Sequence, residues 1–85
     1  MKEDYKKILI TNIDKVHTTI LGKTRIIKNI NYNKDDVISY LKNKIINDNS
    51  VVYKNGKNYY CVIDNIIITV NSYNYCIITV HSIEK

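Results

Sequence analysis

The hydrophobic repeat changes its period once, near Val51, and this change constrains the fold more than any other feature of the sequence. Before it, apolar residues recur at helical spacing, as in Val37, Ile38, Leu41, Ile45 and Ile46. After it they alternate, and Asn55-Gly56 divides the alternating segment as a hairpin turn does. A chain of 85 residues suffices for one domain. The sequence therefore predicts a single α+β domain in which helices come first and an antiparallel sheet follows.

Three helices and four strands are expected. The helical spacing predicts helices over about residues 3–15, 20–30 and 35–47. The alternation predicts strands over about residues 51–54, 57–63, 66–70 and 74–81, joined by turns at Asn55-Gly56, Asp64-Asn65 and Asn71-Ser72. Strands joined by such short turns form an antiparallel meander. We expect the three N-terminal helices to pack on one face of this four-stranded sheet.

The last strand is the element in which we expect function to lie. Alternation predicts that one set of its side chains meets the helices, namely Cys76, Ile78 and Val80. The other set faces the opposite side, namely Tyr75, Ile77, Thr79 and His81. Thr69 and Asn71 of the third strand join the second set. The sequence thus predicts a half-polar open face that carries the chemistry.

The charge balance favours a polyanionic partner. Thirteen Lys and Arg residues against eight Asp and Glu give a net charge of +5. A solvated lysine surface explains the same charge, and the abundance of Ile, Asn, Lys and Tyr resembles an AT-rich coding bias. No hydrophobic run approaches the roughly 18 residues of a membrane span, and the first residues lack the apolar stretch of a signal peptide. We therefore expect a cytoplasmic protein without a membrane partner.

Several kinds of site are not indicated by the residues present. His17 and His81 are far apart in the sequence and lack nearby paired carboxylates, so no metal site is predicted. Gly22 and Gly56 are the only glycines, which excludes a glycine loop for phosphate, and no cofactor is expected. Cys61 and Cys76 lie among tyrosines and isoleucines and are predicted to be reduced core residues. Whether these two cysteines are adjacent in the sheet is left open.

The remaining polar residues suit metal-independent RNA cleavage by attack of the 2′-hydroxyl on the phosphate. The predicted catalytic set is His17, Arg25, Thr79 and His81. Histidine can act as general base or acid, arginine can neutralise the phosphorane, and threonine can orient the phosphate. The predicted nucleic-acid-binding set is Lys23, Lys28, Lys57, Tyr75 and Asn71. Each also has a structural explanation, such as a helix end for His17 or ordinary strand propensity for Thr79.

Two blocks of the sequence carry a family resemblance. His17-Thr18-Thr19-x-Leu21-Gly22-x-x-Arg25 and Ile78-Thr79-x-His81, with Gly56-Lys57-Asn58-x-Tyr60 between them, resemble an uncharacterised family of small bacterial proteins known only as a domain of unknown function. The resemblance covers about residues 13–82. More distantly, the layout is similar to the barnase–EndoU–colicin–RelE-like nucleases, which pair N-terminal helices with a four-stranded antiparallel sheet. That similarity implies a ribonuclease toxin with His17, Arg25, Thr79 and His81 as catalytic residues, although no glutamate lies in the suspected site.

The sequence is therefore consistent with three functions. The first is an RNA-cleaving toxin or phage-encoded effector, which an antitoxin could accompany. The second is a non-catalytic phage or mobile-element inhibitor that binds a protein of a nucleic-acid-handling immune complex through its Tyr-rich sheet. The third is a plain nucleic-acid-binding module. The RNA target, the protein partner and the oligomeric state are left open.

Overall fold

Three helices and one sheet make up the chain. The computed structural model describes residues 4–34 and 36–83. The helices are α1 (Tyr5–Thr11), α2 (Ile20–Ile30) and α3 (Val37–Ile46), with a short 3₁₀ turn, η1 (Ile13–Lys15), after α1. The strands β1 (Val51–Asn55), β2 (Asn58–Ile63), β3 (Ile66–Asn71) and β4 (Ile77–Ser82) form one antiparallel sheet in the order β1-β2-β3-β4. The predicted α+β fold with three helices and a four-stranded antiparallel sheet is confirmed.

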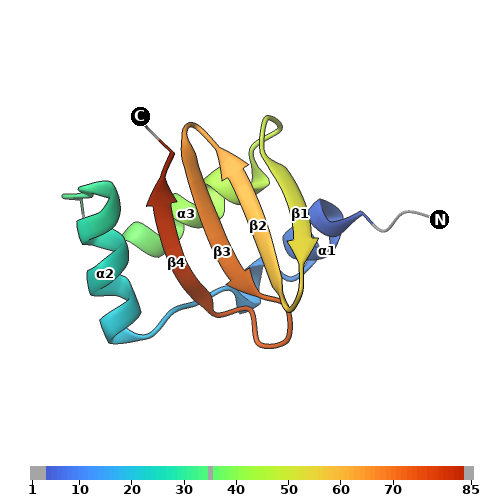
Figure 1. The fold of residues 1–85 in the computed structure, drawn as a ribbon, viewed down its shortest axis with the longest axis horizontal. Helices are drawn as coiled ribbons and strands as arrows, with labels where there is room; N and C mark the ends of the chain where they lie inside the picture. Colours follow the sequence, from blue (N-terminus) through green and yellow to red (C-terminus); the bar gives the residue numbers. More distant parts are fainter. Residues whose placement is uncertain (1–3, 35, 84–85) are drawn as a thin grey trace.

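The helices do not all lie over the sheet. In Figure 1, α1 and α3 lie behind the strands, whereas α2 runs alongside β4 at the edge of the sheet. This differs from the predicted arrangement, in which all three helices pack on one face of the sheet. Because α2 flanks the edge, it can contribute side chains to either side of the sheet. The front of the sheet in Figure 1 is not covered by any described helix.

Local hydrogen bonds explain where the helices begin and end. Residues 3 and 35, where two helices were predicted to start, lie outside the described residues. The first helix ends early because the Asn12 side chain donates to the carbonyl of Ile8 (2.9 Å) and competes with helical bonding. The second begins after Thr19, whose hydroxyl accepts from the amide of Gly22 (2.9 Å), and ends at Asn31 in the left-handed region (φ 55°).

The core lies between the sheet and the helices behind it. Its fully buried side chains come from every layer and include Leu9, Ile26, Leu41, Ile45, Cys61, Ile68 and Val80. Burial raises the pKa of the Cys61 thiol, so this thiol stays protonated and is a poor nucleophile. Cys76 is half-buried in the segment before β4, and β3 separates β2 from β4. The two cysteines are therefore not cross-strand neighbours.

Two-residue turns join β1 to β2 and β2 to β3. The second predicted turn is observed, since Asp64 (φ 48°) and Asn65 (φ 66°) both take positive φ. The first is displaced by one residue, because Asn55 pairs with Asn58 and the turn consists of Gly56 and Lys57. Gly56 has a φ of 63°, a conformation that glycine adopts without steric cost.

The last strand is shorter than predicted and contains an irregularity. It begins at Ile77 rather than residue 74, and the pairing with β3 shifts register between Thr69 and Val70. This bulge turns Ile77 (1% exposed) into the core together with Val80 and leaves Ile78 45% exposed. The predicted inward position of Ile78 and outward position of Ile77 are therefore wrong. Thr79 and His81 keep the predicted orientation.

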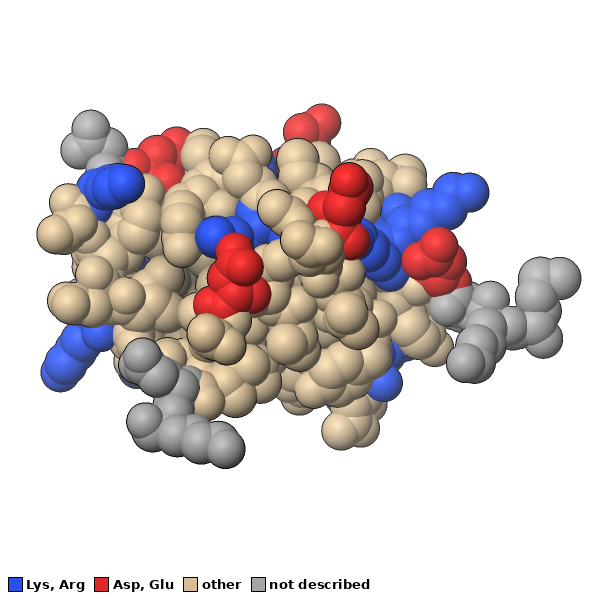
Figure 2. Space-filling model, turned by 90° about the horizontal axis from the view of Figure 1, so that it is seen from above, with Lys and Arg blue, Asp and Glu red and all other residues tan. Residues whose placement is uncertain are grey.

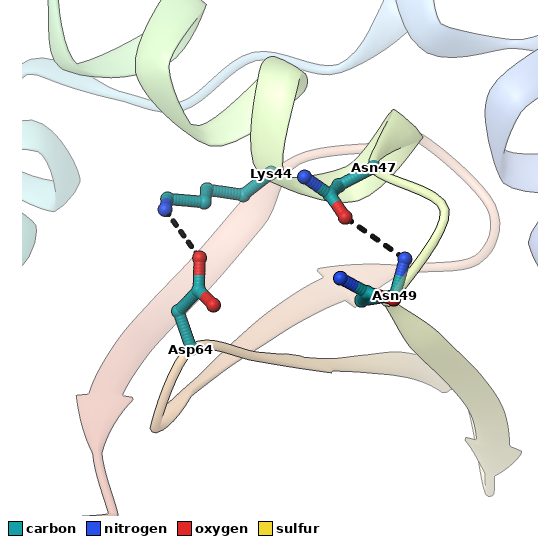
Figure 3. A network of polar contacts seen from close by, with 4 residues as sticks. All are labelled: Lys44, Asn47, Asn49 and Asp64. Atoms are coloured by element: carbon teal, nitrogen blue, oxygen red, sulfur yellow. Dashed lines mark hydrogen bonds and ion pairs between the residues drawn. The ribbon is translucent and has the colours of Figure 1, made fainter.

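Polar contacts tie α3 to the turns at one end of the sheet (Figure 3). The Lys44 Nζ and Asp64 Oδ2 atoms lie 2.5 Å apart, and this hydrogen bond raises the pKa of Lys44. The side chain of Asn47 accepts from the amide of Asn49 (2.8 Å) and shapes the loop that leads into β1.

Within the described part of the chain, no helix combines the length and apolar character needed to cross a membrane.

The N-cap of α3 predicts an acid-dependent loss of stability. Asp36 accepts from the amide and the hydroxyl of Ser39, which lowers the pKa of Asp36 below its usual value of 3.8. A lowered folded-state pKa stabilises the native state above the unfolded value, and this contribution is lost as pH falls through the folded value. Asp36→Asn should therefore lower the thermal midpoint above pH 3.8, and the difference from the wild type should narrow below it. Thermal melts over the acid range measure this, and a pH-independent difference would contradict it.

Candidate functional site

The uncovered side of the sheet presents three cross-strand rows of side chains, which we call the open face. The strand register defines the rows as Asn55, Asn58 and Asn71; Tyr53, Tyr60, Thr69 and Thr79; and Val51, Val62, Ile67 and His81. Successive side chains of a strand alternate between faces, so the residues between these point to the helices. The open face thus combines amides, aromatic rings, hydroxyls and aliphatic groups on a rigid platform.

The middle row contains an aromatic pair at its β1 end. The rings of Tyr53 and Tyr60 are stacked, with centroids 5.3 Å apart and an interplanar angle of 18°. Tyr53 lies on the edge strand and is 45% exposed, so one side of the pair is accessible to a ligand. Further along the row Thr69 is buried, and Thr79 is its cross-strand neighbour on β4. The row therefore changes from aromatic to hydroxyl-bearing toward α2.

At the other end of the middle row Asn29 of α2 contacts Thr79 of β4, and we call this contact, with the neighbouring Arg25 and His81, the seam. The Asn29 Nδ2 atom donates to the Val80 carbonyl (3.2 Å) and lies 3.5 Å from the Thr79 Oγ1 atom. Arg25 precedes Asn29 by one helical turn and therefore lies on the same side of α2. His81 follows Thr79 by two residues on the same face of β4. The contact between α2 and β4 is thus made by Asn29 and Thr79, with Arg25 one helical turn before it on α2 and His81 two residues beyond it on β4.

His17, the fourth predicted catalytic residue, lies elsewhere. Its backbone extends the sheet beside the start of β4, donating to the Tyr75 carbonyl (3.1 Å) and accepting from Ile77 (2.6 Å). Its Nδ1 atom is 2.8 Å from the Lys15 carbonyl. Its bridge partner Cys76 precedes His81 by five residues, or about 16 Å of strand. Groups that protonate and deprotonate one phosphodiester must each reach it at hydrogen-bond distance, so His17 and His81 do not form a catalytic pair.

Two of the predicted nucleic-acid-binding residues have structural contacts instead. The side chain of Asn71 accepts from the amides of Tyr73 and Asn74 and shapes the β3–β4 connection. Tyr75 precedes β4 with a φ of 59°, and its ring lies 6.5 Å from that of Tyr59 on the helix side. The expected outward position of Tyr75 is therefore wrong. The backbone leaves the strand conformation there, so the alternation does not extend to it.

The predicted lysines occupy three separate surroundings. Lys23 lies toward α3, because its charge contributes to lowering the pKa of Asp36 at the N-terminus of that helix. Lys28 is exposed on α2, and Lys57 is exposed in the turn between β1 and β2. Only Arg25 among the basic residues of α2 lies one turn from Asn29 on the side that contacts Thr79.

Charge is segregated between the parts of the fold. Neither the four strands nor α2 contains an Asp or Glu residue. The described carboxylates lie in caps, turns and loops, namely Asp4, Asp14, Asp36, Asp48 and Asp64. In the view from above (Figure 2), the red side chains lie over the middle and upper part of the picture. An anion on the open face therefore meets no carboxylate from the platform itself.

Three residues of this surface were not predicted as site residues. The contact of Asn29 with β4 had a signal in the sequence, since Asn29 follows Arg25 by four residues within a predicted helix. The pairing of Tyr53 with Tyr60 does not follow from the predicted turn at Asn55-Gly56, which lies one residue before the observed turn. With the turn at Gly56 and Lys57 the two rings are direct neighbours.

The described residues contain no group of three or more His, Cys, Asp or Glu side chains that could hold a metal ion.

Comparison with protein families found a match to a family model described as "Protein of unknown function (DUF3781)", over residues 10–81. Neither the curated proteins nor the solved structures gave a match. The comparisons therefore support the resemblance to an uncharacterised family and give no support to the one with nucleases.

Proposed function

Since the chain belongs to the DUF3781 family, whose members are described as proteins of unknown function, we propose a function from its own surface, namely the binding of single-stranded RNA on the open face. The observation that carries this proposal is the combination of a stacked tyrosine pair with strands and a flanking helix that lack carboxylates. Unpaired bases stack on exposed aromatic rings of sheets, and the backbone follows basic side chains.

The chemistry of the middle row favours RNA over a duplex. A duplex presents its phosphates outward and keeps its bases paired, so the accessible ring of Tyr53 could not stack on them. An unpaired strand exposes both the base faces and the sugar hydroxyls. The hydroxyl of Thr79 and the exposed amide of Asn55 in the neighbouring row can form hydrogen bonds with a 2′-hydroxyl, which DNA lacks.

Fluorescence anisotropy with a labelled single-stranded RNA tests this proposal. We expect the double variant Tyr53→Ala/Tyr60→Ala to bind roughly tenfold or more weakly, because each stacked base is worth about 1–3 kcal/mol. The control is Tyr73→Ala, which removes a ring that is 75% exposed in the β3–β4 connection, outside the three rows. The affinity should also fall with salt, and a DNA of the same sequence should bind less tightly.

The control variant and a test for a protein partner distinguish RNA binding on the open face from its alternatives. Equal losses in the double variant and in Tyr73→Ala would contradict binding on the open face. Circular dichroism melts of all variants establish that folding is retained. A wild-type protein that binds no nucleic acid but captures one stoichiometric protein would instead support the alternative of a protein-binding inhibitor.

RNA cleavage without metal is the second candidate, because Arg25 lies one helical turn from the Asn29–Thr79 contact and His81 lies two residues from Thr79 on the same face of β4. In this reaction His81 takes the proton of the 2′-hydroxyl, the 2′-oxygen attacks phosphorus, and the 5′-oxygen leaves. With His17 far away, the leaving oxygen would take its proton from water. RNA incubated with the protein and EDTA should then yield 2′,3′-cyclic phosphate ends that His81→Ala does not produce. RNA that stays intact while bound would leave binding as the only activity.

A further inference from the structure

The seam has the hydrogen-bonding character of a phosphate site. The Asn29 Nδ2 atom faces both the Val80 carbonyl and the Thr79 hydroxyl oxygen, so Thr79 receives a donor at its oxygen. No acceptor in the described part of the chain takes the hydroxyl proton of Thr79, which can therefore point away from α2 and be donated to a ligand. A phosphate oxygen only accepts hydrogen bonds, whereas the edge of a base carries both donors and acceptors. A phosphate is therefore the better partner for the Thr79 hydroxyl.

Positive charge accompanies this donor. Arg25 lies one turn before Asn29 on the same side of α2, and its guanidinium offers a planar set of donors that matches phosphate oxygens. Neither α2 nor β4 contains a carboxylate that would compete for it. Arg25 is also the only arginine of the chain. A positive charge thus lies one helical turn from the hydroxyl donor, on the same side of α2.

The two ends of the middle row differ in what bounds them. At the β1 end the row finishes at an exposed edge residue, Tyr53, beyond which a bound strand can continue. At the other end α2 lies along β4 and bounds the platform (Figure 1). The outer edge of β4 is closed there, because Thr18 Oγ1 donates to the Ile77 carbonyl (2.9 Å) and Asn29 to the Val80 carbonyl. A strand that lies across the rows is therefore free to extend past β1 and ends at α2.

We propose that the seam binds the terminal phosphate of a single-stranded RNA whose bases lie on Tyr53 and Tyr60. Arg25 and Thr79 contact the phosphate, and Asn29 is a positioning residue that directs the Thr79 hydroxyl toward it. This inference rests on the proposed RNA binding and adds the end of the strand as the group that is recognised. A phosphate monoester carries more charge than an internal diester, so an arginine at the end of the row favours it.

Matched oligonucleotides test the inference. Short RNAs of about four to six nucleotides, near the lower limit of site sizes on small β-platforms, are compared with a 5′-phosphate, with a 3′-phosphate and with neither. We expect one phosphorylated form to bind the wild type at least about tenfold more tightly than the unphosphorylated RNA, a gain typical of a charge-assisted contact. Arg25→Ala and Thr79→Val should reduce this ratio toward one. Asn29→Ala should also reduce this ratio. The double variant Asn29→Ala/Thr79→Val should lose no more than Thr79→Val alone, because Asn29 acts through the Thr79 hydroxyl.

The matched control is Lys23→Ala, which removes one positive charge from the same helix on the side near Asp36. It should keep the preference for the phosphorylated end, because the Lys23 charge acts near Asp36 and not at the seam. Equal affinity for all three RNAs, or a preference that persists in Arg25→Ala and Thr79→Val, would overturn the inference and leave the proposed function standing. If none of the RNAs binds, the proposed function fails as well.

Discussion

Replacing Ile68 with alanine is expected to lower the free energy of unfolding by about 2–5 kcal/mol, because the substitution empties space that the surrounding core cannot fill. Ile68 is fully buried at the centre of the sheet, where β3 pairs with β2 through Cys61 and with β4 through Val80. A domain of this size is stabilised by roughly 5–10 kcal/mol in total. The single change therefore removes a large share of the stability, and urea unfolding followed by circular dichroism measures it.

The adjacent residue provides the matched control for this prediction. Ile67 has the same side chain, lies on the same strand and points to the open face, where it is only partly buried. Ile67→Ala should cost roughly 1 kcal/mol or less, as is usual for changes outside the core. Comparable losses at Ile67 and Ile68 would mean that the open face is covered in solution, which would contradict both the assigned core and an accessible ligand platform.

The elements that could be predicted from the sequence are those whose local signals agree with their tertiary surroundings. The spacing of Ile26, Ile27 and Ile30 indicates a helix, and the Thr19 cap and left-handed Asn31 mark its ends. The turn at Asp64 and Asn65 follows from residues that tolerate positive φ. In these places residue type alone selects one backbone conformation.

The sequence-based predictions were wrong where the position of a single residue determines how two strands pair. At the first hairpin, glycine can take either turn position, and moving the turn by one residue moves every cross-strand partner by two. A turn at Asn55-Gly56 would pair Tyr53 with Asn58, whereas the observed turn pairs Tyr53 with Tyr60. In β4 a bulge exchanged the orientations of Ile77 and Ile78. Bulges depend on packing between strands, and no local residue preference predicted this one.

The candidate site could be predicted only in part for a related reason. Arg25, Thr79 and His81 are predicted from their chemistry, and the packing of α2 along β4 places Asn29, one helical turn after Arg25, against Thr79. His17 was selected in the same way, but its backbone is bonded to Tyr75 and Ile77 at the opposite end of that strand. Residue type indicates which reactions are chemically feasible. Which of the residues meet depends on the path of the segment between α1 and α2, and its hydrophobic pattern does not specify that path.

Gly22→Ala is expected to destabilise the protein by about 1–3 kcal/mol, the reverse of what helix propensity predicts. In an exposed helix, alanine is favoured over glycine by roughly 1 kcal/mol. At Gly22, however, an added Cβ would lie 2.4 Å from the Thr18 Oγ1 atom and 3.0 Å from that of Thr19. The Thr18 hydroxyl cannot move away without losing its hydrogen bond to the Ile77 carbonyl. The methyl group therefore breaks one of the contacts that close the edge of β4.

A double-mutant cycle separates this close contact from other effects of the substitution. In the background of Thr18→Ala the hydroxyl is absent, and the remaining Thr18 Cβ lies 3.7 Å from the added methyl, an ordinary contact distance. Gly22→Ala should then cost clearly less than in the wild type, with a coupling free energy of about 0.5–3 kcal/mol. Thermal and urea unfolding of the four proteins measure it. Stabilisation by Gly22→Ala in the wild-type background would show that Thr18 does not hold α2 against β4, and the closed end on which the terminal-phosphate site depends would be lost with it.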